Sequence, residues 1–209
     1  MALEATHIRF ALDLKDKYQV KDLEKYVSGT IYPDSRYVSE IGRELTHPKD
    51  HMDWDIFKVD DFKKGWLVHL LCDKIQYLVT KEKFPEIFEG QDASAGNERW
   101  IGHTALKILQ DIDDVQKFDI TKYLPYLDYV ANPNGEDIAK VKQYNQIFQR
   151  VYKDPGKVPI EDYYEMWKEL GIGDELATKV RNKTEKFQKD PKTMELIRPI
   201  YSEMLSRVQ

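Results

Sequence analysis

Apolar residues recur at intervals of three and four along most of the chain, the spacing that places them on one face of an α-helix. The clearest segments are 59–81, where Asp60 or Asp61 offers an N-terminal cap, and 97–118. Clear strand alternation is absent from the sequence. The pattern therefore predicts an all-α fold, with further helices expected at 120–130, 136–152, 160–170, 174–188 and 193–208.

The segment 29–53 departs from this pattern. It contains Gly29, Pro33 and Pro48, which break helices, and it is too long for a simple connector. Long irregular loops inside compact domains tend to be functional or disordered. Because this one carries Tyr32 and Tyr37 among its apolar residues, it is predicted to be an ordered, packed loop.

Composition narrows the functional classes. A chain of 209 residues with 41% apolar residues is long enough for one helical domain over 1–209. The lone Cys72 excludes a disulfide framework and is expected in the core, while a net charge of −5 gives no electrostatic footprint for nucleic acid. Neither a signal peptide nor a membrane segment is recognisable, so a cytoplasmic protein is expected. The chemistry must come from five histidines and the carboxylates near them.

His69 and Asp73 lie four residues apart on the predicted helix 59–81 and therefore share one helix face. Phe62 and Trp66 precede them on that side, so the face is predicted to point inward. A buried carboxylate needs a partner. The pair is either hydrogen-bonded within the core or shares a cation.

Three further residues precede this helix: His7 in the first predicted helix, and Asp34 and His47 in the segment 29–53. Taken singly, each has a structural explanation, such as a cap, a turn or a loop residue. Imidazole and carboxylate groups from separate segments are also what a zinc site uses, often with a position left open for water. The half of the chain over 1–118 is therefore predicted to hold a metal site. The half over 119–209, which contains no histidine, is expected to support or cover that site, with its tyrosines in helix packing.

The order His…Gly-x-x-x-Pro-Asp…Thr-His…Gly-x-x-x-His-x-x-x-Asp, over roughly the first 80 residues, resembles the bacterial zinc-dependent phospholipase C family. That family shares its all-helical fold with the zinc-dependent single-strand nucleases. The resemblance implies a zinc cluster, with Asp73 as a possible bridge between ions. Its implied ligands are His7, Asp34, His47, His69 and Asp73.

The sequence also departs from the family. The family uses an N-terminal Trp amine as a ligand, whereas this chain begins with Met1, and the family's second helical His motif carries a Glu where Lys107 stands here. One or two ions, with zinc favoured over manganese or iron, are therefore expected rather than three. His103 is either an added ligand, together with Asp111 or Asp114, or a partly exposed helix residue. His51 is expected at the surface.

The predicted activity is hydrolysis of phosphoesters, because a bound divalent ion lowers the pKa of its water towards about 7 and polarises a phosphoryl oxygen. Asp34 and Asp73 are the candidate catalytic carboxylates, with Asp34 acting as a ligand or as a base. Arg36 and Arg43 are candidate ligands for substrate phosphate, although surface ion pairs would explain them equally well. The expected partner is a small phosphoester substrate.

Two alternatives remain open. One is an HD-type phosphohydrolase, weakened because the sequence has no adjacent His-Asp pair. The other is a non-catalytic helical domain that retains the fold.

Overall fold

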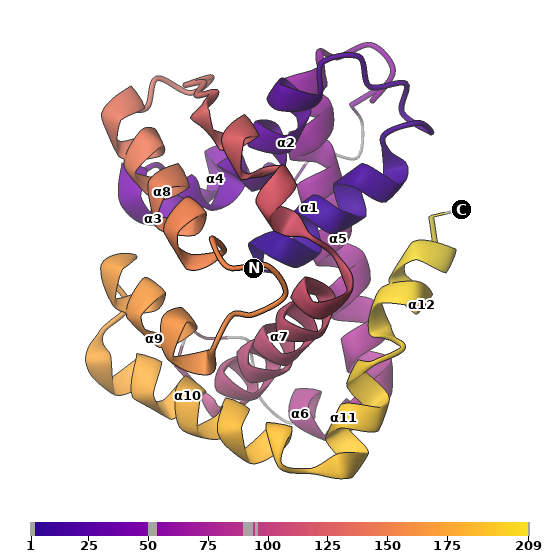
Figure 1. Ribbon diagram of the computed structural model, residues 1–209, viewed down its shortest axis with the longest axis vertical. Coiled ribbons are helices and arrows are strands. Elements are labelled where there is room, and N and C mark those ends of the chain that lie inside the picture. The colour runs from indigo at the N-terminus through magenta and orange to yellow at the C-terminus, as the bar shows by residue number, and fades with distance from the viewer. Residues whose placement is uncertain (1–2, 50–53, 90–93, 95, 209) are drawn as a thin grey trace.

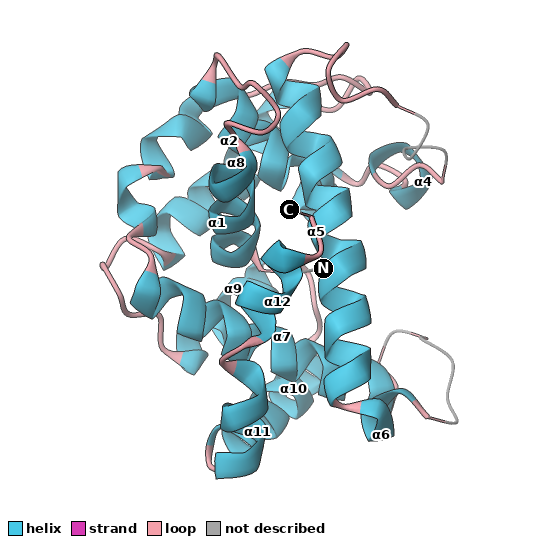
Figure 2. Cartoon of the chain, turned by 90° about the vertical axis from the view of Figure 1, so that its right-hand side faces the viewer, coloured by secondary structure: helices cyan, strands magenta, loops and turns pink. Residues whose placement is uncertain are grey.

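The computed structural model describes residues 3–49, 54–89, 94 and 96–208, and within these ranges it contains helices and no strands, which confirms the all-α prediction (Figures 1 and 2). Short 3₁₀ helices, labelled η, occur among the α-helices. The α-helices are α1 (Glu4–Leu14), α2 (Leu23–Ile31), α3 (Arg36–Ser39), α4 (Arg43–Thr46), α5 (Asp61–Lys83), α6 (Pro85–Phe88), α7 (Glu98–Lys117), α8 (Ile138–Val151), α9 (Ile160–Glu169), α10 (Asp174–Gln188), α11 (Pro191–Ile197) and α12 (Ile200–Ser206). The 3₁₀ helices are η1 (Tyr32–Ser35), η3 (Ile120–Lys122) and η4 (Leu124–Asp128).

The two helices with the clearest periodicity form close to their predicted positions. The side chain of Asp60 caps α5 by accepting a hydrogen bond from the Lys63 backbone, and Asn97 caps α7 by accepting from the backbone of Trp100. Lys81 and Lys83 lie in the last turn of α5, where positive charge favours the helix dipole. Local sequence signals therefore set both helices.

The helix α1 lies among α2, α5 and α7 at the centre of the molecule (Figure 1). Residues of α1 and α7 belong to two apolar clusters, one extending to α8, α9 and α10 and the other to α5, α11 and α12. Cys72 is buried in the second cluster, as expected. Both faces of α1 are thus packed, which holds His7 in the interior.

The prediction of an irregular loop over 29–53 is wrong. The helix α2 continues through Gly29, and η1, α3 and α4 follow it. A Cβ on Gly29 would lie 2.0 Å from the Phe62 carbonyl oxygen, and one on Gly65 would lie 2.0 Å from that of Tyr26. These glycines allow α2 and α5 to cross in close contact. The segment is packed, as predicted, with Tyr32 buried, although residues 50–53, including His51, lie outside the described ranges.

Two C-terminal predictions also need correction, while α8, α9 and α10 match theirs. The segment 120–130 forms η3 and η4 rather than one α-helix, with Pro125 near the start of η4. The segment 193–208 is divided into α11 and α12, because Pro199 cannot donate the backbone hydrogen bond that a continuous helix needs. In the described ranges, no helix combines the length and apolar character that crossing a membrane requires.

Candidate metal centre

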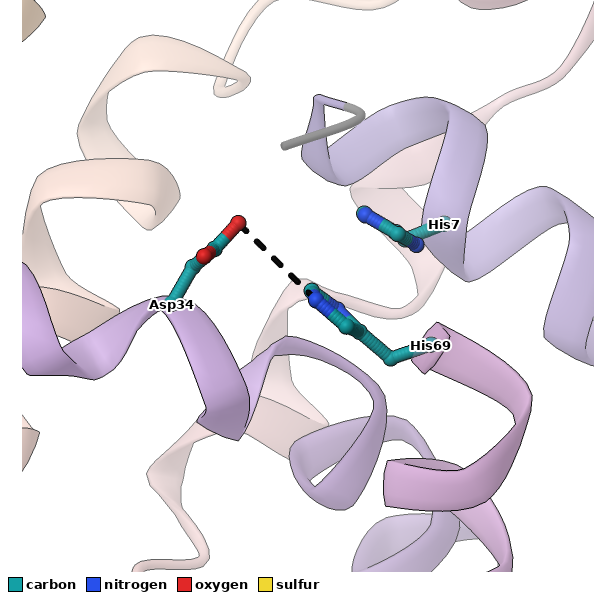
Figure 3. Close-up of side chains that lie close together, drawn as sticks. All are labelled: His7, Asp34 and His69. Atoms are coloured by element: carbon teal, nitrogen blue, oxygen red, sulfur yellow. Dashed lines mark ion pairs between the residues drawn. The ribbon is translucent and has the colours of Figure 1, made fainter. Parts of the chain in front are cut away.

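The structure brings together the five residues that the family resemblance implies as ligands. His7 comes from α1, Asp34 from η1, and His69 and Asp73 from α5. His47 directly follows α4. Figure 3 shows His7 and Asp34 on either side of His69, with a dashed ion pair joining Asp34 to His69. Segments far apart in the sequence therefore converge on one position.

The nitrogen and oxygen atoms of this cluster lie beyond hydrogen-bond distance of one another but within reach of a common ion. His69 Nε2 lies 3.9 Å from Asp34 Oδ2 and 3.9 Å from Asp73 Oδ2. His7 Nε2 lies 3.6 Å from Asp73 Oδ1, and His47 Nε2 lies 3.9 Å from Asp34 Oδ1 and from Asp73 Oδ2. Tetrahedral ligands held about 2.1 Å from zinc are roughly 3.4 Å apart, so these separations approach those of an ion site.

Two overlapping sets of donors are compact enough to hold an ion. In each of the sets His7, Asp34, His69 and His47, His69, Asp73, one ligand atom per residue lies within 4.8 Å of the others. His69 belongs to both sets. A single ring nitrogen binds one ion, so the two sets describe alternative or adjoining faces of one centre.

Most polar atoms of the cluster are buried without a hydrogen-bond partner in the part of the chain that the structure describes. These atoms are both ring nitrogens of His7, both carboxylate oxygens of Asp34, and Nε2 of His47 and of His69. Buried polar groups are normally paired, and each unpaired one costs about 1–3 kcal/mol. A divalent cation would satisfy one such atom on each residue that binds it, so the residues fit a metal ion.

Hydrogen bonds set the orientation of two imidazoles. Nδ1 of His69 lies 2.8 Å from the backbone oxygen of Thr30, which only accepts, so the ring proton is on Nδ1 and the Nε2 lone pair faces the cluster. Nδ1 of His47 contacts the Thr46 hydroxyl at 3.0 Å. Such contacts to the second ring nitrogen orient histidine ligands in metal sites.

The electrostatics keep the histidines in the neutral form that binds metal. Burial lowers the pKa of His7 well below its ordinary value and also lowers the pKa of His69. For His47, burial, together with the proximity of His69 and Arg43, which would repel a proton on its ring, brings the pKa to about 2. Burial would raise the pKa of Asp73, yet positive charge around it, including that of Lys107, holds this pKa well below the usual range.

His103 lies outside both sets of donors. Its ring packs edge-on against Tyr77 and Phe88, with ring centroids 5.8 and 5.0 Å away. The carboxylates considered as its partners are occupied elsewhere: Asp111 accepts from Thr6, and Asp114 also pairs with Arg9. The structure therefore does not bring His103, Asp111 and Asp114 together as a ligand group.

A cavity of about 900 Å³ reaches the centre at Asp73. Arg36 and Arg43 line this cavity, as the predicted role in phosphate binding requires. Other lining residues come from α5, α7, the turn before α10 and α10 itself, and they include Tyr77, Trp100, His103, Lys107 and Leu176. Asp73, with 15% of its side chain exposed, is the one carboxylate of the centre that lines the cavity, whereas Asp34 is buried.

Sequence reasoning missed a layer of hydrogen bonds behind the centre. The hydroxyls of Tyr152 and Tyr163, which were expected only to pack helices, both donate to Asp111 Oδ2 at 2.7 Å. Tyr144 likewise donates to Glu4 at 3.1 Å. The available signal was the position of Asp111 on the apolar face of a helix, where a buried carboxylate demands donors.

No protein-family model, curated protein or solved structure matches this chain. The functional interpretation therefore rests on the motifs of the sequence and the geometry of the centre.

Proposed function

We propose that this protein is a metal-dependent hydrolase of phosphoesters, similar over its first 80 or so residues to the zinc-dependent phospholipase C family. One observation carries the proposal: histidine and aspartate side chains from four segments converge with their buried donor atoms unpaired. Imidazole and carboxylate donors suit zinc, manganese and iron, and zinc is the ion we favour.

The donor set supports one ion, or two that share a bridging carboxylate. His69 offers a single free ring nitrogen, since its other nitrogen is bonded to Thr30. Asp73 has its two oxygens directed at different histidines, Oδ1 at His7 and Oδ2 at His47 and His69. This arrangement suits a carboxylate between two ions, and Asp73 is the residue we assign to that position.

The two candidate catalytic carboxylates differ in their surroundings. Asp34 is buried with both oxygens facing imidazoles, which favours the role of ligand over that of base. Asp73 lines the cavity, so its carboxylate can accept a hydrogen bond from a water molecule there and orient it towards the substrate. A divalent ion held by these residues would make water more acidic and polarise the phosphoryl oxygen.

The cavity favours a catalytic centre over a purely structural metal site. Structural zinc sites are closed by four protein ligands, whereas catalytic sites keep a position open to water or substrate. Here the centre borders a cavity of about 900 Å³. That volume lies within the roughly 300–1,000 Å³ of small-molecule sites and exceeds what phosphate alone would fill.

The test combines metal analysis with one substitution. Protein purified without a histidine tag is expected to contain at least one equivalent of zinc, manganese or iron, and to hydrolyse generic phosphoesters. Asp73→Asn keeps the side-chain size but removes the charge, and it should lower kcat/KM at least about 100-fold while leaving the circular dichroism spectrum unchanged. Asp16→Asn is the control, because Asp16 is exposed and, within the described residues, its carboxylate pairs with Lys15 alone.

Two results would contradict the proposal. One is protein that carries no such metal and gains no activity from any added divalent ion. The other is an Asp73→Asn variant that remains as active as Asp16→Asn.

A further inference from the structure

Lys107 is a buried cation that forms no hydrogen bond or ion pair with any described residue. It lies on α7 with 7% of its surface exposed. Lys64, which is buried to a similar degree with 8% exposed, pairs with Asp61 at 2.8 Å. Burying an unpaired charge is costly, so the environment of Lys107 is suited to an anion that binds beside it.

Lys107 lines the cavity that reaches the candidate metal centre. Asp73 lines the same cavity. An anion in front of Asp73 would therefore lie within the field of Lys107. Because α7 supplies no residue to either set of candidate metal ligands, Lys107 approaches from a different element.

A second cation in the same cavity also has an unused donor. The Nε atom of Arg36 is buried and makes no hydrogen bond in the described chain, and its nearest charged neighbour is Asp34 Oδ1 at 3.9 Å. The rest of the guanidinium is held by Tyr37, through a hydrogen bond of 2.5 Å to its hydroxyl and stacking at 4.0 Å from its ring. Arg43, at the exposed edge, is a third cation lining the cavity.

The balance of charge selects among phosphoesters. One divalent ion would balance the charges of Asp34 and Asp73, including the one that Arg36 faces at 3.9 Å. The buried Lys107 and the partly buried Arg36 then remain as positive charges in the cavity wall, beside the exposed Arg43 and Lys74. A phosphomonoester carries close to two negative charges above its second pKa of about 6, whereas a diester carries one. The excess of positive charge favours the monoester.

We propose that Lys107, together with Arg36, binds the terminal phosphoryl oxygens of a phosphomonoester, and that this makes monoesters the preferred substrate class. The proposal rests on the proposed function. In the hydrolysis, the water oxygen bonds to phosphorus as the ester P–O bond breaks. The proton that the water loses ends on the departing alkoxide, which leaves an alcohol and inorganic phosphate. Trp100, Tyr77 and Leu176 line the cavity around the organic group of the substrate.

The first experiment measures anion binding on the full-length, zinc-loaded protein, because the charge balance includes one divalent ion, and it records binding rather than hydrolysis. Titration calorimetry at pH 7.5 compares methyl phosphate with dimethyl phosphate. We expect the wild type to bind methyl phosphate more tightly, and Lys107→Met to weaken that binding at least about tenfold, as loss of a hydrogen bond to a charged group predicts. Lys74→Met is the matched control: Lys74 lines the same cavity but is exposed, so its removal should change the affinity less than about threefold.

Met retains most of the Lys stem, and the charge it removes is unpaired, so Lys107→Met should have a melting temperature no lower than that of the wild type. Equal binding of methyl phosphate by wild type and Lys107→Met would overturn the proposal, as would equal losses in the Lys107 and Lys74 variants.

The second experiment separates this proposal from the proposed function. With metal-loaded protein, the ratio of kcat/KM for phenyl phosphate to that for methyl phenyl phosphate should fall at least about tenfold in Lys107→Met, at unchanged metal content. Phosphate binding that depends on Lys107 in a protein lacking hydrolase activity would refute the proposed function but leave the anion site standing. Hydrolysis with an unchanged ratio would refute the role of Lys107 but leave the hydrolase standing.

Discussion

At the scale of single residues, the centre depends on a buried carboxylate that touches no candidate metal ligand. Asp111 accepts hydrogen bonds from the Thr6 backbone at 2.8 Å and from the hydroxyls of Tyr152 and Tyr163. Thr6 immediately precedes His7. These bonds therefore fix the first turn of α1 against α7 and, with it, the position of the His7 ring.

The hydroxyl of Thr6 links this carboxylate to a second one. It lies 3.1 Å from Asp111 Oδ1 and 2.8 Å from Asp114 Oδ2, but it has only one proton to donate. Burial raises the pKa of Asp114 to about 7, against the opposing charge of Arg9. A protonated Asp114 donates to Thr6, which then donates to Asp111, so all three groups are satisfied.

Asp114 predicts a specific dependence of stability on pH. Because its folded-state pKa is raised above the ordinary 3.8, the folded state holds this proton more tightly than the unfolded state between pH 3.8 and 7. The contribution of Asp114 to the unfolding free energy is therefore lost as the pH rises through that window, and it no longer changes at higher pH. Relative to Asp114→Asn, the wild type should lose about 2 kcal/mol of unfolding free energy between pH 5 and 7.

Urea denaturation of both proteins at several pH values measures this difference, and the titrations that the two proteins share cancel. A difference that is constant from pH 5 to 7 would contradict the assignment of a raised pKa to Asp114.

At the scale of elements, helices that depend on local residue spacing and capping can be predicted from the sequence. Features that depend on contact with a helix distant in the sequence cannot. The helices α5 and α7 follow from their periodicity and caps. From the local sequence Gly29 is expected to end a helix. In the structure its missing side chain lets α2 approach the Phe62 carbonyl on α5. The order of the motifs pointed to the five residues that converge. It could not place His103, because the side-chain contacts of α7 depend on α5 and α6.

The glycine crossing gives a prediction for α5. In an open helix, Gly→Ala stabilises by about 1 kcal/mol, but a Cβ on Gly65 would lie 2.0 Å from the backbone oxygen of Tyr26. The helices must separate, so Gly65→Ala should lower the unfolding free energy by about 1–3 kcal/mol. It should also weaken metal binding, since the crossing holds Thr30 against His69.

Gly102→Ala on α7 is the matched control for this substitution. Its Cβ would meet the Ile87 side chain, which can move, at 3.1 Å, so stability should change by less than about 1 kcal/mol. Chemical denaturation and competition with a metal-binding dye measure the two effects. Equal stability of the two variants would show that the crossing is not as tight as described.

At the scale of the whole molecule, the candidate ligands connect elements that are distant in sequence. An ion held by them would join α1, η1, the end of α4 and α5, while α8, α9 and α10 pack on the other side of α1 and α7. Metal binding and folding should therefore be coupled, because the unfolded chain does not hold these donors together.

This coupling predicts that metal raises the melting temperature. Zinc at about 100 times its dissociation constant should add about 2.7 kcal/mol of stability, if the unfolded chain binds none. For a chain of this length that corresponds to a rise of roughly 5–10 °C over chelator-treated protein.

His69→Gln should abolish the rise, because His69 belongs to both sets of donors. His103→Gln should retain it, because His103 packs against Tyr77 and Phe88 apart from both sets. Calorimetry of the three proteins with chelator and with zinc makes the comparison. A rise that survives in His69→Gln, or that disappears in His103→Gln, would place the ion elsewhere in the molecule.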